Sequence, residues 1–535
     1  MAINVHGQVT IPKNIQRARD WKAGTPISVI QSDDSSSILR ARQMPQPKPE
    51  LHFAALNPAS DAYELELQVQ AGTLLRLAEG IYAPLMPENE LAALVRRQWQ
   101  QVAGAIAPGG VLSHLSAMKG GVLESGVLVL SHPTHPEGEV VLPGLRLFIV
   151  SGPGPLAGDM PLGTSGLHFA GRARMLLENL DRSGIVPASA SDAETHLVTL
   201  LIASDGWALK VLLGQAGAIA LSLRAEQALR ELHAIICALL GKRPHSTLRT
   251  VAGRAAAQGM PIDTARLELF LVLAEHLRSK SLPRIDAPPR LATLHAAFIE
   301  AYFSNFVEGI KFNIEEARGI VLSGQVDERR PKDSHDLLGV FRLASAAPYR
   351  NSPPTPGPQF LDDLAQWHAE MMEMRPEANP GLPKVDANYA GTTRFVDPAF
   401  VRGTLAEGSK LADDIPEGLA RAIFYALLIS EVHAFVDGNG RLCRLVMNAE
   451  LSRSGCNRII IPTLFHPQYV DCARALTRTQ SPGGFIRCLA KMAQWSSQFD
   501  YSDLDKLIPM LKTTNAFEES PADYRLMNTD GSVAA

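Results

Sequence analysis

The chain has 535 residues, room for three or four domains at about 150 residues each, and its 46% of apolar residues excludes wholesale disorder. Its net charge of −4 excludes a uniformly basic chain that coats nucleic acid. The sequence does not open on a signal-peptide core, and no stretch offers the roughly 18 charge-free apolar residues of a membrane helix, so we expect a soluble, cytoplasmic protein without a membrane partner. The five cysteines lack CxxC or zinc spacing and are expected to be reduced, buried thiols.

The first segment, residues 1–44, alternates apolar and polar side chains, with strands expected near residues 26–30 and 37–42. It holds six Lys or Arg residues against three Asp, an excess of three positive charges in a chain that is negative overall. Proline at every second position of residues 45–49 favours an extended connection. We therefore predict a small β module at the N-terminus, followed by a spacer.

The middle region, residues 50–275, mixes helices and strands. Apolar residues at a spacing of three or four predict a helix over residues 88–107, and strand-like runs cover residues 122–130 and 139–150. Beyond residue 167 the sequence becomes rich in Ala and Leu and largely helical. This region is the mixed α/β part of a multidomain α+β protein.

The C-terminal side, residues 285–500, follows a proline-rich boundary at residues 281–290 and is predicted to be almost all helix. The exception is residues 345–359, whose five prolines predict a loop or a short hairpin. Residues 501–535 form a C-terminal segment, and its polar tail beyond Glu518 is expected to be loose.

The stretch with the most chemistry runs from His433 to Arg444, with the sequence HAFVDGNGRLCR. Apolar helical runs flank it at residues 418–432 and 442–451, whereas DGNG continues a helix poorly. The second helix therefore begins just after a glycine-flanked turn. Its N-terminus, which carries partial positive charge, points at that turn.

This turn is suited to hold an anion. The backbone of Gly438, Asn439 and Gly440 can aim successive N–H groups into one concavity at the helix N-terminus. Arg441 and Arg444, three residues apart, lie near one face of the first helical turn and can fork onto phosphate oxygens.

Two further groups complete the set. Asp437 supplies the hard oxygen that Mg²⁺ prefers while it bridges phosphates, and His433 is a base of a type that titrates near neutral pH. Together these groups are what transfer of a phosphate-containing group to a hydroxyl requires. The alternative is a solvated inter-helix loop with a glycine cap, which each residue alone would support but the whole set disfavours.

The stretch resembles the Fic family motif, HxFx(D/E)GNGRxxR, at every specified position, with Ala434 where the family usually has proline. The resemblance covers about residues 285–500, including RIIIP at residues 458–462. It implies an all-α Fic domain and protein adenylylation, also called AMPylation. In that reaction a Ser, Thr or Tyr hydroxyl of a protein substrate attacks the α-phosphorus of ATP, Mg²⁺ is bound and pyrophosphate leaves.

The resemblance also implies roles for the residues of the motif. His433 would take the hydroxyl proton, and Asp437 would hold Mg²⁺. The backbone of residues 438–440 and Arg441 would hold the α- and β-phosphates, and Arg444 would hold the γ-phosphate.

Two further expectations follow from the resemblance. Tyr469 contacts the nucleoside, with a half-buried packing role as the alternative. The family's flap, a hairpin that docks the target backbone as an added strand, is expected near residues 341–359.

Upstream, residues 291–306 are predicted to form a helix that leads into SNFVEG, with Ser304 and Glu308 four residues apart. Family members often carry an inhibitory helix with the pattern (S/T)xxxE(G/N), whose Glu pairs with the second Arg of the motif and blocks the γ-phosphate. The resemblance therefore implies autoinhibition by Glu308 through Arg444, and a surface Glu near a helix end is the alternative. In some such proteins the same Glu activates water to remove AMP, so deAMPylation is a second implied activity.

Two resemblances concern the N-terminal half. Residues 6–13 (HGQVTIPK) are similar to the AbrB/SpoVT swapped-hairpin DNA-binding domain, which implies DNA as a partner and a homodimer; an unrelated β module is the alternative. Residues 50–275 resemble the AbiEi antitoxin and regulator family through GIY at residues 80–82, VLSHLSA at residues 111–117 and ARMLLENL at residues 173–180.

The leading hypothesis is a regulated AMP transferase. The alternative is a DNA-binding regulator or antitoxin-like protein whose Fic domain is silenced. Intact His433, Asp437 and Arg444 favour the enzyme, because a degenerate domain would be free to lose them.

Overall fold

The computed structural model describes residues 27–31, 37–41, 49–54, 62–180, 188–204, 206–288 and 290–534. The chain divides into two compact units, of which the first comprises Met1–Ser189 and Ala216–Ala228 and the second Ala190–Gln215 and Leu229–Ala535. Within the described residues, no helix combines the length and the apolar character needed to cross a membrane.

The N-terminal hairpin consists of β1 (Ile27–Gln31) and β2 (Ser37–Ala41), which pair antiparallel with Ile27 opposite Ala41. This confirms the two strands expected near residues 26–30 and 37–42. The HGQVTIPK segment lies outside the described residues, so the swapped-hairpin assignment of residues 1–44 stays a prediction.

The rest of the first unit holds two sheets and short helices. A three-stranded antiparallel sheet has the order β3-β5-β4, and a six-stranded mixed sheet has the order β10-β11-β6-β7-β9-β8. The central strand β7 is buried at every residue, as expected for a strand covered on both faces. The strands are β3 (His52–Phe53), β4 (Leu74–Ala78), β5 (Ile81–Pro84), β6 (Val111–Leu112), β7 (Val127–His132), β8 (Gly138–Leu142), β9 (Leu145–Ser151), β10 (Met160–Leu162) and β11 (Leu167–Phe169). The helices are α2 (Ala62–Gln70), α3 (Glu88–Arg97), α4 (Trp99–Ile106), α5 (His114–Lys119) and α6 (Arg172–Leu180).

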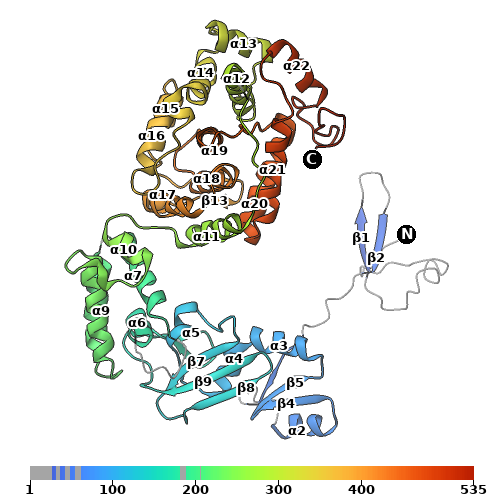
Figure 1. Cartoon of the computed structure of the whole chain (residues 1–535). Helices are drawn as coiled ribbons and strands as arrows, with labels where there is room; N and C mark the ends of the chain where they lie inside the picture. The colour runs from blue at the N-terminus through green and yellow to red at the C-terminus, as the bar shows by residue number, and fades with distance from the viewer. Residues whose placement is uncertain are drawn as a thin grey trace, which may run out of the picture. The chain divides into compact units, whose positions relative to one another are not determined.

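The second unit is largely helical, and in Figure 1 helices between α11 and α21 surround α18 and α19. Every residue of α18 except Arg421 and Ser430 is buried, which is typical of a helix in the core of a large domain. The helices after the first unit are α7 (Ala190–Ser204), α8 (Trp207–Ile219), α9 (Glu226–Leu239), α10 (Val251–Ala257), α11 (Thr264–Ser279), α12 (Arg290–Phe306), α13 (Ile314–Ser323), α14 (Pro331–Ser345), α15 (Ala347–Arg350), α16 (Phe360–Met371), α17 (Val401–Lys410), α18 (Leu419–Val432), α19 (Asn439–Arg453), α20 (His466–Thr479), α21 (Gly483–Ser496) and α22 (Leu504–Thr513).

Helix α11 belongs to the core of this helical unit. Its buried residues include Leu269, Phe270 and Leu273, which join the same apolar cluster as α18 and α19. Helix α11 packs against both α17 and α18. The helical unit therefore extends N-terminal to residue 285, where the Fic-like resemblance was expected to begin.

Residues 345–359, expected to be a loop or a short hairpin, contain the short helix α15, then a loop over residues 351–359, and no strand. Pro348 lies in the first turn of α15, where a missing N–H costs no hydrogen bond. The hairpin of the helical unit lies further along the chain, in β12 (Tyr389–Ala390) and β13 (Thr393–Arg394), with Gly391 in the turn at a φ of 61°. No hairpin therefore lies near residues 341–359, where the flap was expected.

The tail beyond Glu518, expected to be loose, packs against the helical core. The carbonyl of Met527 accepts a hydrogen bond of 2.9 Å from the indole of Trp495, and Leu526 is buried. All five cysteines are free thiols, as expected, and three of them are buried: Cys443, Cys456 and Cys488.

Candidate active site

The site is built on the turn between α18 and α19. His433 caps the C-terminus of α18 in the left-handed conformation, with a φ of 51°. Gly438 precedes the first residue of α19 with a φ of 77°, in the left-handed region that favours glycine. The turn thus has a residue with a left-handed backbone conformation at each end, His433 and Gly438.

The side chain of Asn439 holds this turn in shape. Its amide oxygen accepts from the N–H of Phe435 at 2.9 Å, and its amide nitrogen donates to the carbonyl of Phe435 at 2.8 Å. Asn439 is buried and its side chain is occupied in this way. What it can offer to an anion is therefore its backbone N–H at the start of α19.

One cavity of about 310 Å³ gathers most of the residues expected in the site. Elements far apart in the sequence line it, among them the α18–α19 turn, α20 and the β12–β13 hairpin. The expected residues that line it are His433, Asp437, Gly438, Asn439, Gly440, Arg444, Tyr469 and Glu308. Arg441 instead lines a neighbouring cavity of about 370 Å³, which shares Glu308 and Asp437 with the first.

His433 is held as a neutral base. Its ring stacks on Phe395, just after the hairpin, with centroids 3.8 Å apart, and its Nδ1 lies 3.3 Å from the carbonyl of Ser430. Because a carbonyl can only accept, Nδ1 carries the proton and Nε2 keeps its lone pair. Burial and the nearby Lys384 ammonium lower the pKa of His433 to about 4.

Lys384 and Asn388 support the histidine from behind. The ammonium of Lys384 donates to the Asn388 side chain at 2.6 Å and to the carbonyl of Val432 at 3.2 Å. The amide of Asn388 in turn donates to the carbonyl of His433 at 3.3 Å. Burial lowers the pKa of Lys384 to about 8. No sequence pattern points to these residues, because they lie 45 or more positions from the turn that they hold.

Arg444 is held by the segment that the resemblance identified as inhibitory. Its Nε donates to the hydroxyl of Ser304 at 2.9 Å, its Nη2 donates to the carbonyl of Ser304 at 3.0 Å, and Nη2 lies 2.7 Å from the carboxylate of Glu308. Ser304 lies in the last turn of α12, whereas Glu308 follows the helix end at Phe306. The expected contact between Glu308 and Arg444 is therefore present, and the two contacts with Ser304 are additional.

The carboxylate of Glu308 lies over the first turn of α19. A Cβ added to Gly440 would collide with its Oε1, so Glu308 occupies the position next to the backbone N–H groups of this helix end. Burial raises the pKa of Glu308, but Arg444 and Arg441 outweigh it and the pKa is lowered overall. Glu308 therefore stays ionised at neutral pH.

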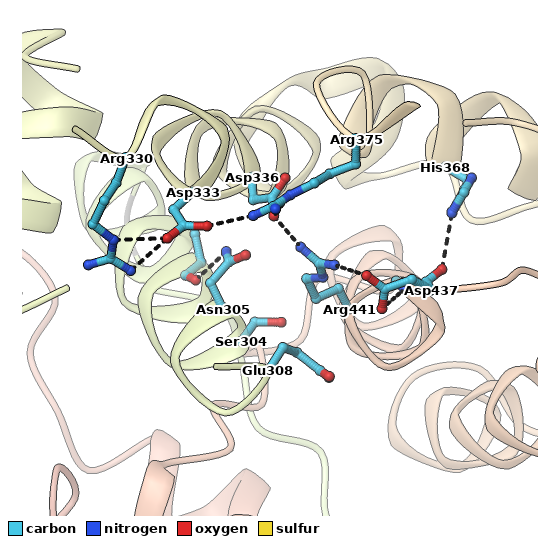
Figure 2. Close-up of polar contacts among 12 residues, drawn as sticks. Ser304, Asn305, Glu308, Arg330, Asp333, Asp336, His368, Arg375, Asp437 and Arg441 are labelled. Atoms are coloured by element: carbon cyan, nitrogen blue, oxygen red, sulfur yellow. Dashed lines mark hydrogen bonds and ion pairs between the residues drawn. The ribbon is translucent and has the colours of Figure 1, made fainter. Parts of the chain in front are cut away.

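A chain of alternating charges leads away from Asp437, and Figure 2 shows it. Arg441 lies 3.4 Å from Asp437 and 3.2 Å from Asp336, Asp336 lies 3.0 Å from Arg375, and Arg375 lies 2.5 Å from Asp333. Asp336 and Arg441 are both almost fully buried. The members come from α14, the segment after α16, the α18–α19 turn and α19, so no local motif could have predicted them.

His368 fixes the other side of the same turn. Its Nδ1 accepts from the N–H of Gly381 at 2.9 Å, so its Nε2 carries the proton and donates to the carbonyl of Asp437 at 3.1 Å. The ring stacks on Phe435 with centroids 4.0 Å apart. Burial lowers the pKa of His368 to about 4, which keeps the ring neutral in this position.

We expect Asp336→Asn to lower the free energy of unfolding by roughly 3–5 kcal/mol, because it leaves the buried guanidinium of Arg441 without its buried counter-ion. Urea unfolding measures the change. Asp362→Asn is the matched control, since the Asp362–Arg402 pair is exposed on both sides and should contribute at most about 1 kcal/mol. Equal losses for the two variants would contradict a structural role for the Asp336–Arg441 pair.

Comparison with known proteins gives a match to the Fic/DOC family over residues 359–451. The protein adenylyltransferase fic-1 of Caenorhabditis briggsae is 26% identical over 211 residues, which are 38% of this chain and 40% of that protein. The protein adenylyltransferase Fic of Drosophila erecta is 25% identical over 278 residues, which are 50% of this chain and 53% of that protein. The chain thus spans about half the length of these relatives or less.

Among solved structures, Fic-1 from C. elegans is similar with a TM-score of 0.33 and 17% identity, covering 62% of this chain and 90% of that one. The matched residues 359–451 include the whole α18–α19 turn, so the comparison and the motif agree on where the domain lies. Residues 359–451 thus carry a match to the Fic/DOC family, within a chain that is similar to protein adenylyltransferases.

Proposed function

We propose that the chain is a protein adenylyltransferase that transfers AMP from ATP to a hydroxyl of a protein substrate. The observation that supports this best is one cavity that holds a neutral imidazole with a free Nε2 lone pair beside the N-terminus of α19. The first group can accept a proton, and the second can bind phosphate. The names of the relatives point to the same reaction.

In this proposal the nucleotide lies with its phosphates against the first turn of α19. The N–H groups after Gly438 face the phosphate oxygens, and Arg444 contacts the terminal phosphate. The substrate hydroxyl gives its proton to Nε2 of His433 while its oxygen bonds to the α-phosphorus. The bond from the α-phosphorus to the bridging oxygen breaks, and pyrophosphate leaves with that oxygen.

Asp437 is the residue that would hold Mg²⁺. The described residues contain no cluster of three or more His, Cys, Asp or Glu side chains able to bind a metal by themselves. A single carboxylate fits Mg²⁺ all the same, because this ion is commonly bound by one or two carboxylates together with substrate phosphates. The carboxylate of Asp437 is 61% exposed and lines the cavity, so it can reach such an ion. When bound, the metal neutralises charge that develops on the phosphates.

Glu308 is proposed as the brake on this activity. It pairs with Arg444 and lies against Gly440, so it competes with phosphate for both the guanidinium and the helix N-terminus. The same carboxylate could activate water for removal of AMP, as the resemblance implies. Both roles need the ionised carboxylate, which the lowered pKa of Glu308 provides.

The β12–β13 hairpin is proposed as the flap that docks the substrate. It leads directly into Phe395, whose ring stacks on His433, and Ala390 and Thr393 line the cavity. Tyr389 on its first strand is exposed. A substrate segment that adds to this hairpin as a strand would bring its hydroxyl to His433.

Incubation of the purified chain and its Glu308→Gly variant with ATP labelled on the α-phosphate, alone and with cell lysate, tests the proposed reaction. Label should appear on protein from α-labelled ATP and not from γ-labelled ATP, because AMP and not phosphate is transferred. Label from the γ position alone would indicate a kinase, and no label from either in the variant would overturn the proposal.

DNA binding through residues 1–44 is the second candidate function, favoured by the β1–β2 hairpin together with the excess of three positive charges. We expect the full chain to shift DNA on a gel with an affinity that falls steeply as salt rises, because phosphate contacts release counterions. Deletion of residues 1–44 should remove the shift. A shift that survives the deletion, or none with the intact chain, would contradict this function.

A further inference from the structure

Helix α20 runs along the whole length of the cavity. His466, Tyr469, Val470, Ala473 and Thr477 all line it, at the spacing of one helical face. At 1.5 Å per residue, His466 and Thr477 lie about 16 Å apart along the helix. Because Arg444 and Glu308 act on the pKa of His466, that end of α20 is the phosphate end, and Thr477 marks the opposite end of the cavity.

Glu431 and Thr477 meet at this far end. The hydroxyl of Thr477 donates to Oε1 of Glu431 at 2.6 Å, and Oε2 of Glu431 lies 3.2 Å from Arg266 on α11. Glu431 is buried although it lines the cavity. Arg266 also donates to the carbonyl of Arg394, so its guanidinium is committed to the protein.

The polar groups at this end therefore present acceptors. Thr477 has one hydroxyl proton, and both partners within reach, Glu431 and the carbonyl of Ala473 at 3.1 Å, can only accept it. The hydroxyl of Ser430, which also lines the cavity, donates to the carbonyl of Leu427 at 3.1 Å. The oxygen lone pairs of Thr477 and Ser430 are left for a ligand, which must supply N–H or O–H donors to them.

Arg474 also lines the cavity. Its side chain is 45% exposed and lies 3.6 Å from the carboxylate of Asp471, so its guanidinium is shared with an acidic partner and solvent. The polar groups that meet one another at this end are Thr477 and Glu431.

We propose that Thr477, positioned by Glu431, reads the 6-position of a purine and selects the 6-amino group over a 6-oxo group. This inference rests on the proposed function, since it places the phosphates at Arg444 and the base at the far end. An adenine amino group donates to the lone pair of Thr477, whereas a 6-oxo group brings one acceptor against another. Val470 and Ala473 on the same face of α20 offer apolar contact to the flat base.

Calorimetric titration of the full chain with Mg²⁺ complexes of three triphosphates tests the proposal. ATP carries the 6-amino group, purine riboside triphosphate carries hydrogen there, and inosine triphosphate carries oxygen. We expect ATP to bind about fivefold or more tightly than purine riboside triphosphate, the effect of one hydrogen bond, and tenfold or more tightly than inosine triphosphate.

Variants of Thr477 separate the effect of its hydroxyl on nucleotide affinity from the effect of its side-chain shape. Thr477→Val, which keeps the volume, should remove the advantage of ATP over purine riboside triphosphate, and Thr477→Ser should keep it. Glu431→Gln adds an amide donor beside the hydroxyl and should narrow the preference for ATP over inosine triphosphate. Thr479→Val is the matched control, because Thr479 lies on the same helix with its hydroxyl bonded to the carbonyl of Ala475 and does not line the cavity; it should leave all three affinities unchanged.

The outcomes distinguish this inference from the function on which it rests. Equal affinities for the three triphosphates, or an ATP preference that survives Thr477→Val, would overturn the role of Thr477 and leave the proposed function standing. Binding of none of them, in the chain and in Glu308→Gly alike, would overturn both.

Discussion

His433→Ala is expected to lower the rate of AMP transfer by roughly 10²–10⁴-fold, the usual cost of removing a general base. The hydroxyl of a Ser, Thr or Tyr is a poor nucleophile until its proton is taken. Nε2 of His433 is the atom in the cavity that is placed to take it, because Nδ1 is committed to the carbonyl of Ser430. Transfer of the α-label in a single turnover measures this loss.

Binding of ATP should change little in the same variant, because the phosphate site is formed by α19 and Arg444. His276→Ala is the control, since His276 is exposed on α11 and its Nδ1 is likewise bonded to a carbonyl, that of Val272. Wild-type rates in His433→Ala would overturn its assignment as the base. A loss of ATP binding equal to the loss of rate would make His433 a binding residue instead.

The pH dependence of kcat/KM gives a second test of His433 as the base, because the acid limb of the profile reports its pKa. The pKa of His433 is lowered to about 4 from an ordinary value near 6.5, so the imidazole stays neutral as the pH falls from 7 to 5. It becomes protonated, and useless as a base, only as the pH falls through about 4. Because kcat/KM reports the free enzyme, its acid limb should lie well below pH 6. A limb centred near 6.5 would show that His433 is solvated before the substrates bind.

How much of this site the sequence could predict depends on how local each group is. The turn from His433 to Arg444 is a continuous stretch in which glycine, charge and helix ends have fixed consequences, so the cavity contains nearly every residue expected there. The Glu308–Arg444 contact could be predicted only from a family pattern, because 136 positions separate the two residues. No sequence pattern predicts the Asp336–Arg441 pair, because its residues are more than 100 positions apart and only the fold brings them together.

The hairpin expected near residues 341–359 is a part of the site that the sequence misplaced. The prolines do mark a loop, over residues 351–359, whereas Pro348 fits the first turn of α15. The hairpin that does lie against His433 has strands of only two residues, Tyr389–Ala390 and Thr393–Arg394. Strands so short carry no alternation that a sequence could reveal. The packing of Phe395 on His433, a tertiary contact, is what identifies this hairpin.

Glu308→Gly is expected to raise AMP transfer by about 10–100-fold, the range that a charge-assisted hydrogen bond of about 1.5–3 kcal/mol represents. Arg444 has one guanidinium, and its Nη2 is engaged by the carboxylate at 2.7 Å. The two contacts with Ser304, through its hydroxyl and its carbonyl, remain in the variant, so the guanidinium keeps its orientation while its outer edge becomes free for phosphate. Removal of the carboxylate also takes a negative charge away from Gly440 and the N-terminus of α19.

The gain should appear first as self-labelling, because the nearest hydroxyls are those of the enzyme, and three further variants locate its origin. Glu308→Gln, which removes the charge but keeps most of the volume, should give part of the gain. Glu308→Gly combined with Arg444→Ala should give none, since the freed partner is then absent. Glu519→Gly, which breaks the exposed pair with Lys311, should leave the rate unchanged. If Glu308→Gly labels no better than the wild type while His433 proves essential, Glu308 merely pairs with Arg444, and any regulation of the proposed activity lies elsewhere.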